Sequence, residues 1–153
     1  MSRKQSKGEL YFIEGNMNND YHNKVERIKF FVDDFIERRT YITLNKNDNS
    51  GASVTIEKVV ADPFAEQFNI SISEWDNIIN TLYGEICLHE WKKRYVNHNV
   101  LDGTQWRLEI ELTDKQTFSY YGSNDFPPYW NELLKLFGQL DKSIIRYGGN
   151  KKG

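Results

Sequence analysis

From Trp91 to Gln139 the chain reads WKKRYVNHNVLDGTQWRLEIELTDKQTFSYYGSNDFPPYWNELLKLFGQ. Apolar and polar residues alternate from Gln105 to Leu112, which is typical of a strand with one buried and one solvent-facing side. After a short polar break, the residues from Thr117 to Tyr121 form a second β-rich run. Two such runs joined by a few polar residues predict a β-hairpin.

The segments on either side of this hairpin carry a turn and a helix start. Upstream, Leu101 to Thr104 contains Asp-Gly, and Gly tolerates the positive φ of a tight turn. Downstream, Gly122 to Asp125 breaks the strand, and Pro127 and Pro128 suit the start of a helix, where a missing N–H costs nothing. The apolar residues that follow share one helical face, which should close over the apolar side of the hairpin: Trp130, Leu133, Leu134, Phe137 and Leu140.

The order of these motifs resembles a family of small proteins from low-GC Gram-positive bacteria. The resemblance covers about a third of the chain and rests on the turn, the hairpin and the helix start. The matching residues are Trp91, Tyr95, Val100, Leu101, Asp102, Gly103, Trp106, Leu108, Ile110, Gly122 and Pro127. No activity is assigned to that family as we identify it, so the resemblance implies a fold and transfers no catalytic residue.

Length and composition predict one globular domain. A chain of 153 residues can build a core of its own, and we place the domain at residues 9–146, between a flexible basic N-terminus (1–8) and a flexible basic tail (147–153). The net charge of −2 and the single cysteine require neither nucleic acid nor membrane and fit a reducing cytoplasm. No signal peptide or apolar run of about 20 residues is present, so we expect a cytoplasmic protein without a membrane partner.

The segment from Val25 to Arg39 is ambiguous. Six apolar residues lie at helical spacing, which favours a helix of about fifteen residues: Val25, Ile28, Phe31, Val32, Phe35 and Ile36. The alternative is a strand through Ile28, Phe30 and Val32 that ends at Asp33 and Asp34. The resemblance favours the strand, because members of the family begin with a β-meander.

The other elements have clearer signals. A strand is expected from Glu9 to Glu14, and a second hairpin from Thr40–Asn45 and Ala52–Val60, which are rich in β-branched residues. A helix from Ser73 to Gly84 is predicted by two possible capping boxes and by its apolar spacing, with Gly84 as a left-handed C-cap. A strand from Glu85 to Trp91 follows. The fold class is therefore α+β, an antiparallel sheet of five to six strands with two to three helices packed on one face.

The sequence offers no convincing catalytic or metal-binding set. Cys87 and His89 lie two residues apart, with His98 further on, but a structural zinc site needs four ligands. The hydrophobic surroundings of Cys87 argue for an inert thiol, and no nucleophile or phosphate-binding motif is present. We expect no metal and no cofactor.

The paired acids fit structural roles better than catalysis. General acid–base chemistry needs a carboxylate whose environment shifts its pKa. Glu109 and Glu111 should face water, Asp33 and Asp34 would point apart on a helix, and Asp102 belongs to a turn. An enzyme of unrecognised type is therefore only the third hypothesis.

Two features favour a non-enzymatic protein-binding module of bacterial or phage origin, such as an inhibitor, immunity or accessory protein. Between Lys58 and Lys92 the chain has no Lys or Arg, and its acids could form a face for a basic partner: Asp62, Glu66, Glu74, Asp76, Glu85 and Glu90. A loop rich in aromatic residues offers a second binding surface: Tyr120, Tyr121, Tyr129 and Trp130.

The alternative function is binding of nucleic acid or nucleotides. Three cations, Lys92, Lys93 and Arg94, stand between Trp91 and Tyr95. Such a segment can follow phosphates with its cations and stack bases on its rings. The balanced overall charge makes this the weaker of the two hypotheses.

Overall fold

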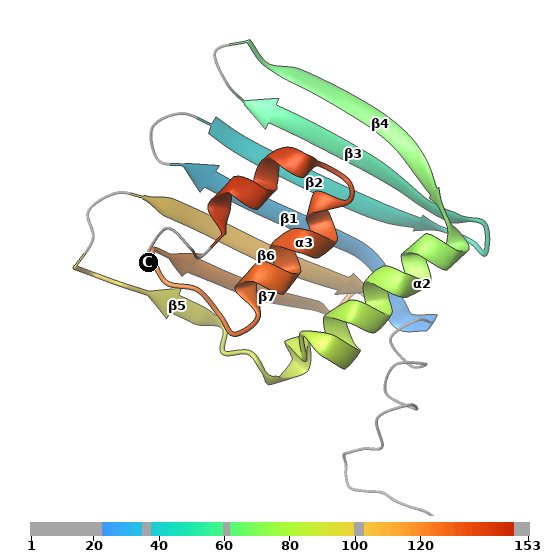
Figure 1. Ribbon diagram of the computed structural model, residues 1–153. Coiled ribbons are helices and arrows are strands. Elements are labelled where there is room, and N and C mark those ends of the chain that lie inside the picture. Colours follow the sequence, from blue (N-terminus) through green and yellow to red (C-terminus); the bar gives the residue numbers. More distant parts are fainter. Residues whose placement is uncertain (1–22, 35–37, 60–61, 100–102, 149–153) are drawn as a thin grey trace, which may run out of the picture.

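The computed structural model describes residues 23–34, 38–59, 62–99 and 103–148. Seven strands form one sheet in the order β4-β3-β2-β1-β6-β7-β5 (Figure 1). All neighbouring pairs are antiparallel except β5 and β7, which run parallel. The strands are β1 (Val25–Asp34), β2 (Arg38–Asn47), β3 (Gly51–Val59), β4 (Phe64–Ser71), β5 (Arg94–Val96), β6 (Thr104–Leu112) and β7 (Thr117–Ser123).

Two α-helices lie on the same face of the sheet (Figure 1). They are α2 (Ile72–Asn80) and α3 (Trp130–Gly138). The described residues also form three short helices: the π-helix η1 (Thr81–Glu85) and the 3-10 helices η2 (Leu88–Glu90) and η3 (Lys142–Tyr147). The predicted α+β class is confirmed, although the sheet has seven strands rather than five or six and is mixed rather than purely antiparallel. None of the described helices is long and apolar enough to cross a membrane.

The helix predicted from Val25 to Arg39 is wrong, because β1 occupies the centre of the sheet. Ile28, Phe30 and Val32 are buried toward the helices, and β1 pairs with β2 on one side and β6 on the other. Alternation with period two therefore prevails over helical spacing. Phe35 and Ile36 lie outside the described residues, as does the strand expected from Glu9 to Glu14.

The helix α3 closes the core over the middle strands, as the sequence predicted. The ring of Phe137 stacks on Phe30 with centroids 4.8 Å apart, and Trp130 lies 5.3 Å from Trp106. The Trp106 Nε1 donates to the carbonyl of Asp125 at 2.9 Å, which fixes the chain between β7 and α3. Large aromatic side chains thus supply the centre of the core, and the N–H of Trp106 finds a backbone acceptor.

Both predicted hairpins are confirmed, whereas the edge strands β4 and β5 were not predicted. β2 pairs with β3, and β6 with β7, around short turns. Gly103, just before β6, has a φ of +138°, a value that glycine adopts readily; the other residues of the predicted turn, Leu101 and Asp102, lie outside the described residues. The sequence does not predict β4, because in this edge strand only Ile70 is fully buried and the alternation of apolar residues is weak.

The region after β4 follows the predicted helix but not the predicted strand. Ser71 caps α2: Glu74 N–H donates to its Oγ at 3.1 Å, and Ser71 N–H donates to the Glu74 carboxylate at 2.8 Å. The helix then continues through η1, so Gly84 is not a left-handed cap. The left-handed residue is Cys87 (φ 57°), after which the chain forms η2. The strand predicted from Glu85 to Trp91 is therefore wrong, and β5 begins at Arg94.

The C-terminal segment is anchored to the fold as far as the structure describes it. Tyr147 is buried, and its carbonyl accepts a hydrogen bond from Trp130 Nε1 at 2.9 Å. The ammonium of Lys58 on β3 contacts Asp141, just before η3, and Ser143 within it. Tyr147, the first residue of the predicted tail, therefore packs into the core.

Candidate functional site

The six acidic residues of the predicted acidic face do not converge on one element. Asp62 precedes β4 and Glu66 lies on it, whereas the others follow along α2, η1 and η2. Five are exposed and Asp76 is half-buried. The Glu74 carboxylate is already used in the capping box of α2. The six acidic residues are therefore distributed over successive segments, from the residues before β4 to η2, rather than gathered on one element.

The four residues of the predicted aromatic loop are divided by the sheet. Tyr120 and Trp130 are buried, with 7% and 5% of their surface exposed. Tyr121 points to the opposite face, because consecutive strand residues alternate, and Tyr129 is 53% exposed. Tyr120 and Trp130 therefore belong to the core and cannot contact a partner directly.

The basic segment forms the edge of the sheet at β5. The rings of Trp91 and Tyr95 are buried, whereas Lys92, Lys93 and Arg94 are exposed. The Lys92 Nζ lies 5.0 Å above the centre of the Tyr95 ring. The segment therefore presents its cations and buries most of each aromatic ring, so neither ring offers an open face for stacking bases.

The face of the sheet opposite the helices presents a row of aromatic and arginine side chains. In the strand register, Tyr41 lies beside Phe31, Phe31 beside Arg107, Arg107 beside Tyr121, and Tyr121 beside Arg94. We call these five residues the aromatic–arginine row. With strands about 4.8 Å apart, the row is roughly 20 Å long. It therefore crosses most of the width of the open face.

Direct contacts order the two ends of the row. The rings of Phe31 and Tyr41 have centroids 4.9 Å apart. The guanidinium of Arg94 lies 5.5 Å above the centre of the Tyr121 ring. A guanidinium in this position is attracted to the negative face of the ring, by about 0.5–1 kcal/mol at an exposed site. Arg107 lies between these two pairs in the strand register.

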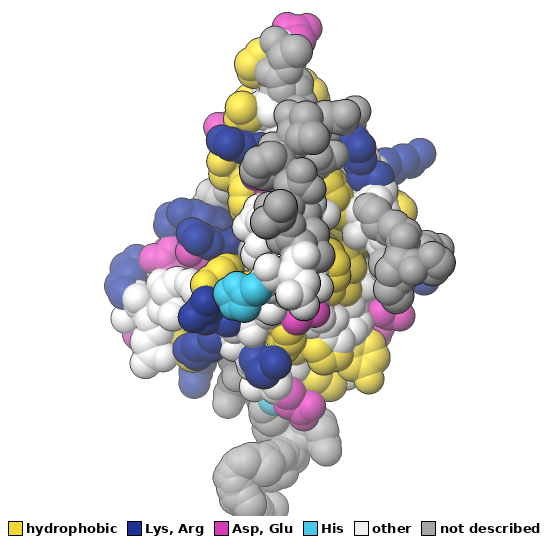
Figure 2. Space-filling model, turned by 90° about the vertical axis from the view of Figure 1, so that its left-hand side faces the viewer, with side chains coloured by type: hydrophobic (Ala, Val, Ile, Leu, Met, Phe, Trp, Pro, Cys, Tyr) yellow, Lys and Arg dark blue, Asp and Glu magenta, His cyan; other side chains and the backbone are white. Residues whose placement is uncertain are grey.

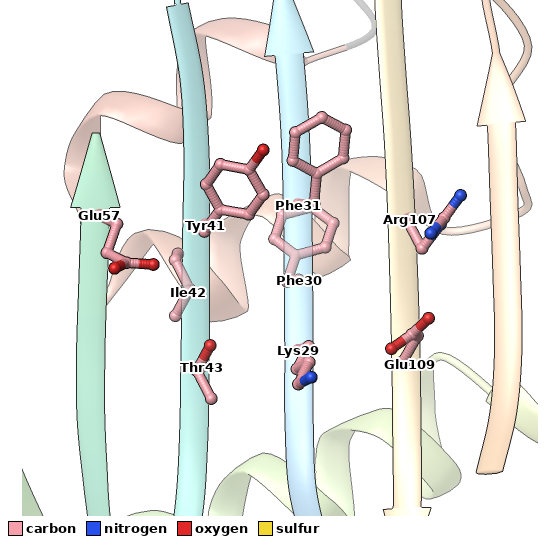
Figure 3. A pocket seen from close by; sticks show the side chains of 9 residues that line it. All are labelled: Lys29, Phe30, Phe31, Tyr41, Ile42, Thr43, Glu57, Arg107 and Glu109. Carbon is pink, nitrogen blue, oxygen red and sulfur yellow. The ribbon is translucent and has the colours of Figure 1, made fainter. Parts of the chain in front are cut away.

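A hollow of about 460 Å³ lies at the centre of the open face. Figure 3 shows the rings of Phe31 and Tyr41 side by side, with Lys29, Thr43, Arg107 and Glu109 around them. The side chains that line the hollow include no Ser, Cys or His; its polar groups are the hydroxyls of Tyr41 and Thr43, the cations of Lys29 and Arg107, and the carboxylates of Glu57 and Glu109.

The charges on the open face nearly balance. The left of Figure 2, the side away from the helices, shows Lys and Arg side chains with acidic ones among them. Arg27 pairs with Glu111 at 2.7 Å, and Arg39 with Asp33 at 3.6 Å. Within the described residues no ion pair includes Arg107. The Arg107 guanidinium is therefore not neutralised by an acidic side chain of the described residues, so it can pair with an acidic group of another molecule.

The cysteine and histidine near η2 do not form a metal site in the described part of the chain. Cys87 is half-buried, and its removal from water raises the pKa of the thiol, as does the nearby charge of Glu90. The His89 ring stacks on Tyr83 with centroids 6.2 Å apart. No group of three or more His, Cys, Asp or Glu residues is placed to hold a metal ion among the residues searched.

Sequence reasoning missed three residues of the row: Phe31, Tyr41 and Arg107. A signal for them existed, since they occupy the polar-facing positions of strands. Residues at such positions lie on the solvent-facing side of a sheet. For Phe31 this reading required Val25–Asp34 to be a strand, whereas Tyr41 and Arg107 lie on strands that the sequence predicted. The chain matches no protein-family model and no curated protein, so its function has to be inferred from the geometry of this surface.

Proposed function

We propose that this chain is a non-enzymatic protein-binding module and that its partner docks on the open face of the sheet, centred on the aromatic–arginine row. The main support is the asymmetry of the sheet: the described helices cover one face only, and the other presents Phe31, Tyr41 and Tyr121 beside arginines. Tyr and Arg are enriched among the residues that dominate binding energy in protein interfaces.

The open face is large enough for a stable complex. The seven strands contain 10, 10, 9, 8, 3, 9 and 7 residues. With about 3.3 Å per residue and about 4.8 Å per strand, they span roughly 900 Å². A standard interface buries about 800 Å² on each partner. The sheet could therefore supply a whole interface without a contribution from the helices.

The charges favour a protein partner of mixed charge. The strand register places both signs on this face: Arg27, Lys29, Arg39, Arg94 and Arg107 beside Asp33, Glu57, Glu109 and Glu111. Opposite charges in neighbouring positions favour a partner with a complementary pattern and disfavour other partners. An inhibitor, immunity or accessory protein in the cytoplasm of a bacterium, or one carried by a phage, would use such a surface.

Binding of single-stranded nucleic acid is the second candidate, and one observation favours it. Arg94 and Arg107 flank Tyr121 on the open face. Stacking of a base on an aromatic ring is worth about 1–3 kcal/mol, and the arginines could contact phosphates. The four carboxylates of the same face would repel a phosphate chain, so we rank this function second.

A partner search with matched variants tests the proposal. Tagged protein is used to capture partners from the native host, and each captured protein is then purified and titrated against the variants. We expect Arg107→Ala and Tyr41→Ala each to weaken binding by about 30-fold, the effect of losing about 2 kcal/mol at an interface hot spot. Tyr129→Ala is the control, because Tyr129 is exposed and lies just before α3, on the helix side.

Three outcomes would contradict the proposal. If the Tyr129→Ala and Arg107→Ala variants bound the partner with the same affinity, the interface would have to lie elsewhere. Repeated failure to capture any protein whose binding depends on the row would argue against a protein partner. Retention of nucleic acid that is lost steeply as salt rises would support the second candidate instead.

A further inference from the structure

A second hollow lies where β5 and β7 meet η1 and η2, away from the open face. Its volume is about 250 Å³, and its lining residues are Tyr83, His89, Trp91, Lys93, Phe118 and Tyr120. Phe118 and Tyr120 point to the helix side of β7, whereas Tyr121 points to the open face. This hollow is therefore separate from the aromatic–arginine row.

The walls of the hollow are aromatic. Trp91 and Tyr120 meet edge to face, with centroids 5.8 Å apart and planes at 84°. Tyr83 and His89 stack with centroids 6.2 Å apart and planes at 23°. Flat, rigid walls of this kind favour a planar apolar group, which can pack on them in stacked or edge-to-face geometry.

The hollow has hydrogen-bond donors but no carboxylate. Lys93 brings an ammonium with three donors and no acceptor, and its Nζ lies 5.9 Å from the centre of the Phe118 ring. The indole of Trp91 adds a group that can only donate. A lining with a cation, donor groups and no acid is complementary to an anion.

The Trp91 indole supplies the second observation. The Trp91 side chain is more than nine-tenths buried, and its Nε1 has no hydrogen-bond partner within the described residues. Leaving a buried donor unpaired costs about 1–3 kcal/mol. Trp106 and Trp130, by contrast, donate to backbone carbonyls at 2.9 Å. Trp75 Nε1 is also unpaired, but Trp75 is fully enclosed and lines none of the hollows described above.

We propose that this hollow binds a small planar aromatic carboxylate. The ring packs against the accessible edges of Trp91 and Tyr120, and the carboxylate accepts a hydrogen bond from Lys93 Nζ. Trp91 Nε1 is enclosed in the structure, so it donates to the carboxylate once the indole turns toward the hollow. The volume lies just below the range of about 300–1,000 Å³ for small-molecule pockets, so the site suits a single ring system with one anionic group. This site is independent of the proposed protein-binding surface.

Calorimetric titration of the full chain with three aromatic acids tests the proposal: benzoate, phenylacetate and indole-3-acetate. Benzamide and benzylamine serve as neutral and cationic analogues of similar shape. We expect at least one of the acids to bind with a 1:1 stoichiometry, at least tenfold more tightly than benzamide, and we expect no binding of benzylamine.

Matched variants locate the site. Lys93→Gln should weaken binding of the acid at least tenfold, whereas Lys92→Gln should leave it unchanged, because Lys92 does not line the hollow. Trp91→Phe keeps a ring but removes the N–H, and it should weaken the acid more than it weakens benzamide. Thermal melting of each variant confirms that the fold is intact.

Any of three results overturns the proposal: no saturable binding of any of the acids, equal affinity for acid and amide, or equal effects of Lys92→Gln and Lys93→Gln. If Trp91→Phe does not fold, the pair of lysine variants decides alone.

Discussion

Gly122 lies where β7 passes closest to the core, and its lack of a side chain is a packing requirement. A Cβ built at this position would lie 2.2 Å from Trp106 Nε1 and 2.7 Å from the Asp125 carbonyl. These are the two groups that form the hydrogen bond between Trp106 and the chain after β7. Trp106 is almost fully buried and cannot move aside without disturbing its neighbours.

We therefore expect Gly122→Ala to lower the free energy of unfolding by about 2–3 kcal/mol, the upper part of the range for overpacked cores. Urea denaturation followed by tryptophan fluorescence measures the change. Gly84→Ala is the control, because Gly84 is exposed in η1 and should change stability by less than about 1 kcal/mol. Equal stability of Gly122→Ala and the parent would show that the strand can shift away from Trp106.

At the scale of elements, local patterns predicted those parts of the fold whose residues alternate or repeat without ambiguity. The hairpin of β6 and β7 and the helix α3 belong to this group. In β1, the same apolar residues satisfy both periods: Val25, Ile28 and Val32 fit a helix, and Ile28, Phe30 and Val32 fit a strand. Pairing with β2 and β6 decides between them, and such long-range pairing has no signature in a local window.

The candidate site was only partly predictable for the same reason. Arg94 and Tyr121 belong to segments that the sequence analysis selected, and both lie in the aromatic–arginine row. Phe31 could be recognised as a surface residue only after β1 was known to be a strand, whereas Tyr41 and Arg107 already lay on predicted strands. The edge strands β4 and β5 were missed because one strand has a single fully buried residue and the other has three residues in all.

The start of α2 offers a direct test of how its helix signal works. The sequence contains two possible capping boxes, beginning at Ser71 and at Ser73, and the structure forms only the first. We expect Ser71→Ala to cost about 1 kcal/mol, because an N–H at the helix start loses its acceptor. Ser73→Ala should change stability by less than about 0.5 kcal/mol. Thermal or urea unfolding of both variants distinguishes them, and a reversed order would mean that the helix begins two residues later.

For the whole molecule, the sheet separates the core from an open face. The described helices and the inner side chains of the strands form the core, while the opposite face carries the docking surface proposed above. Neighbouring residues of β1 divide between the two roles: Phe30 is 1% exposed and stacks on Phe137, whereas Phe31 points to the open face and is only half-buried.

We expect Phe30→Ala to lower the free energy of unfolding by about 3–5 kcal/mol, as is usual for truncation of a buried Phe. Phe31→Ala removes the same atoms from a half-buried position, so it should cost no more than about 1.5 kcal/mol while weakening partner binding by at least tenfold. Urea denaturation of the two variants, together with titration of the partner against Phe31→Ala, provides both measurements. If Phe31→Ala were as unstable as Phe30→Ala, another part of the chain would have to cover the open face, and that face could not be the docking surface.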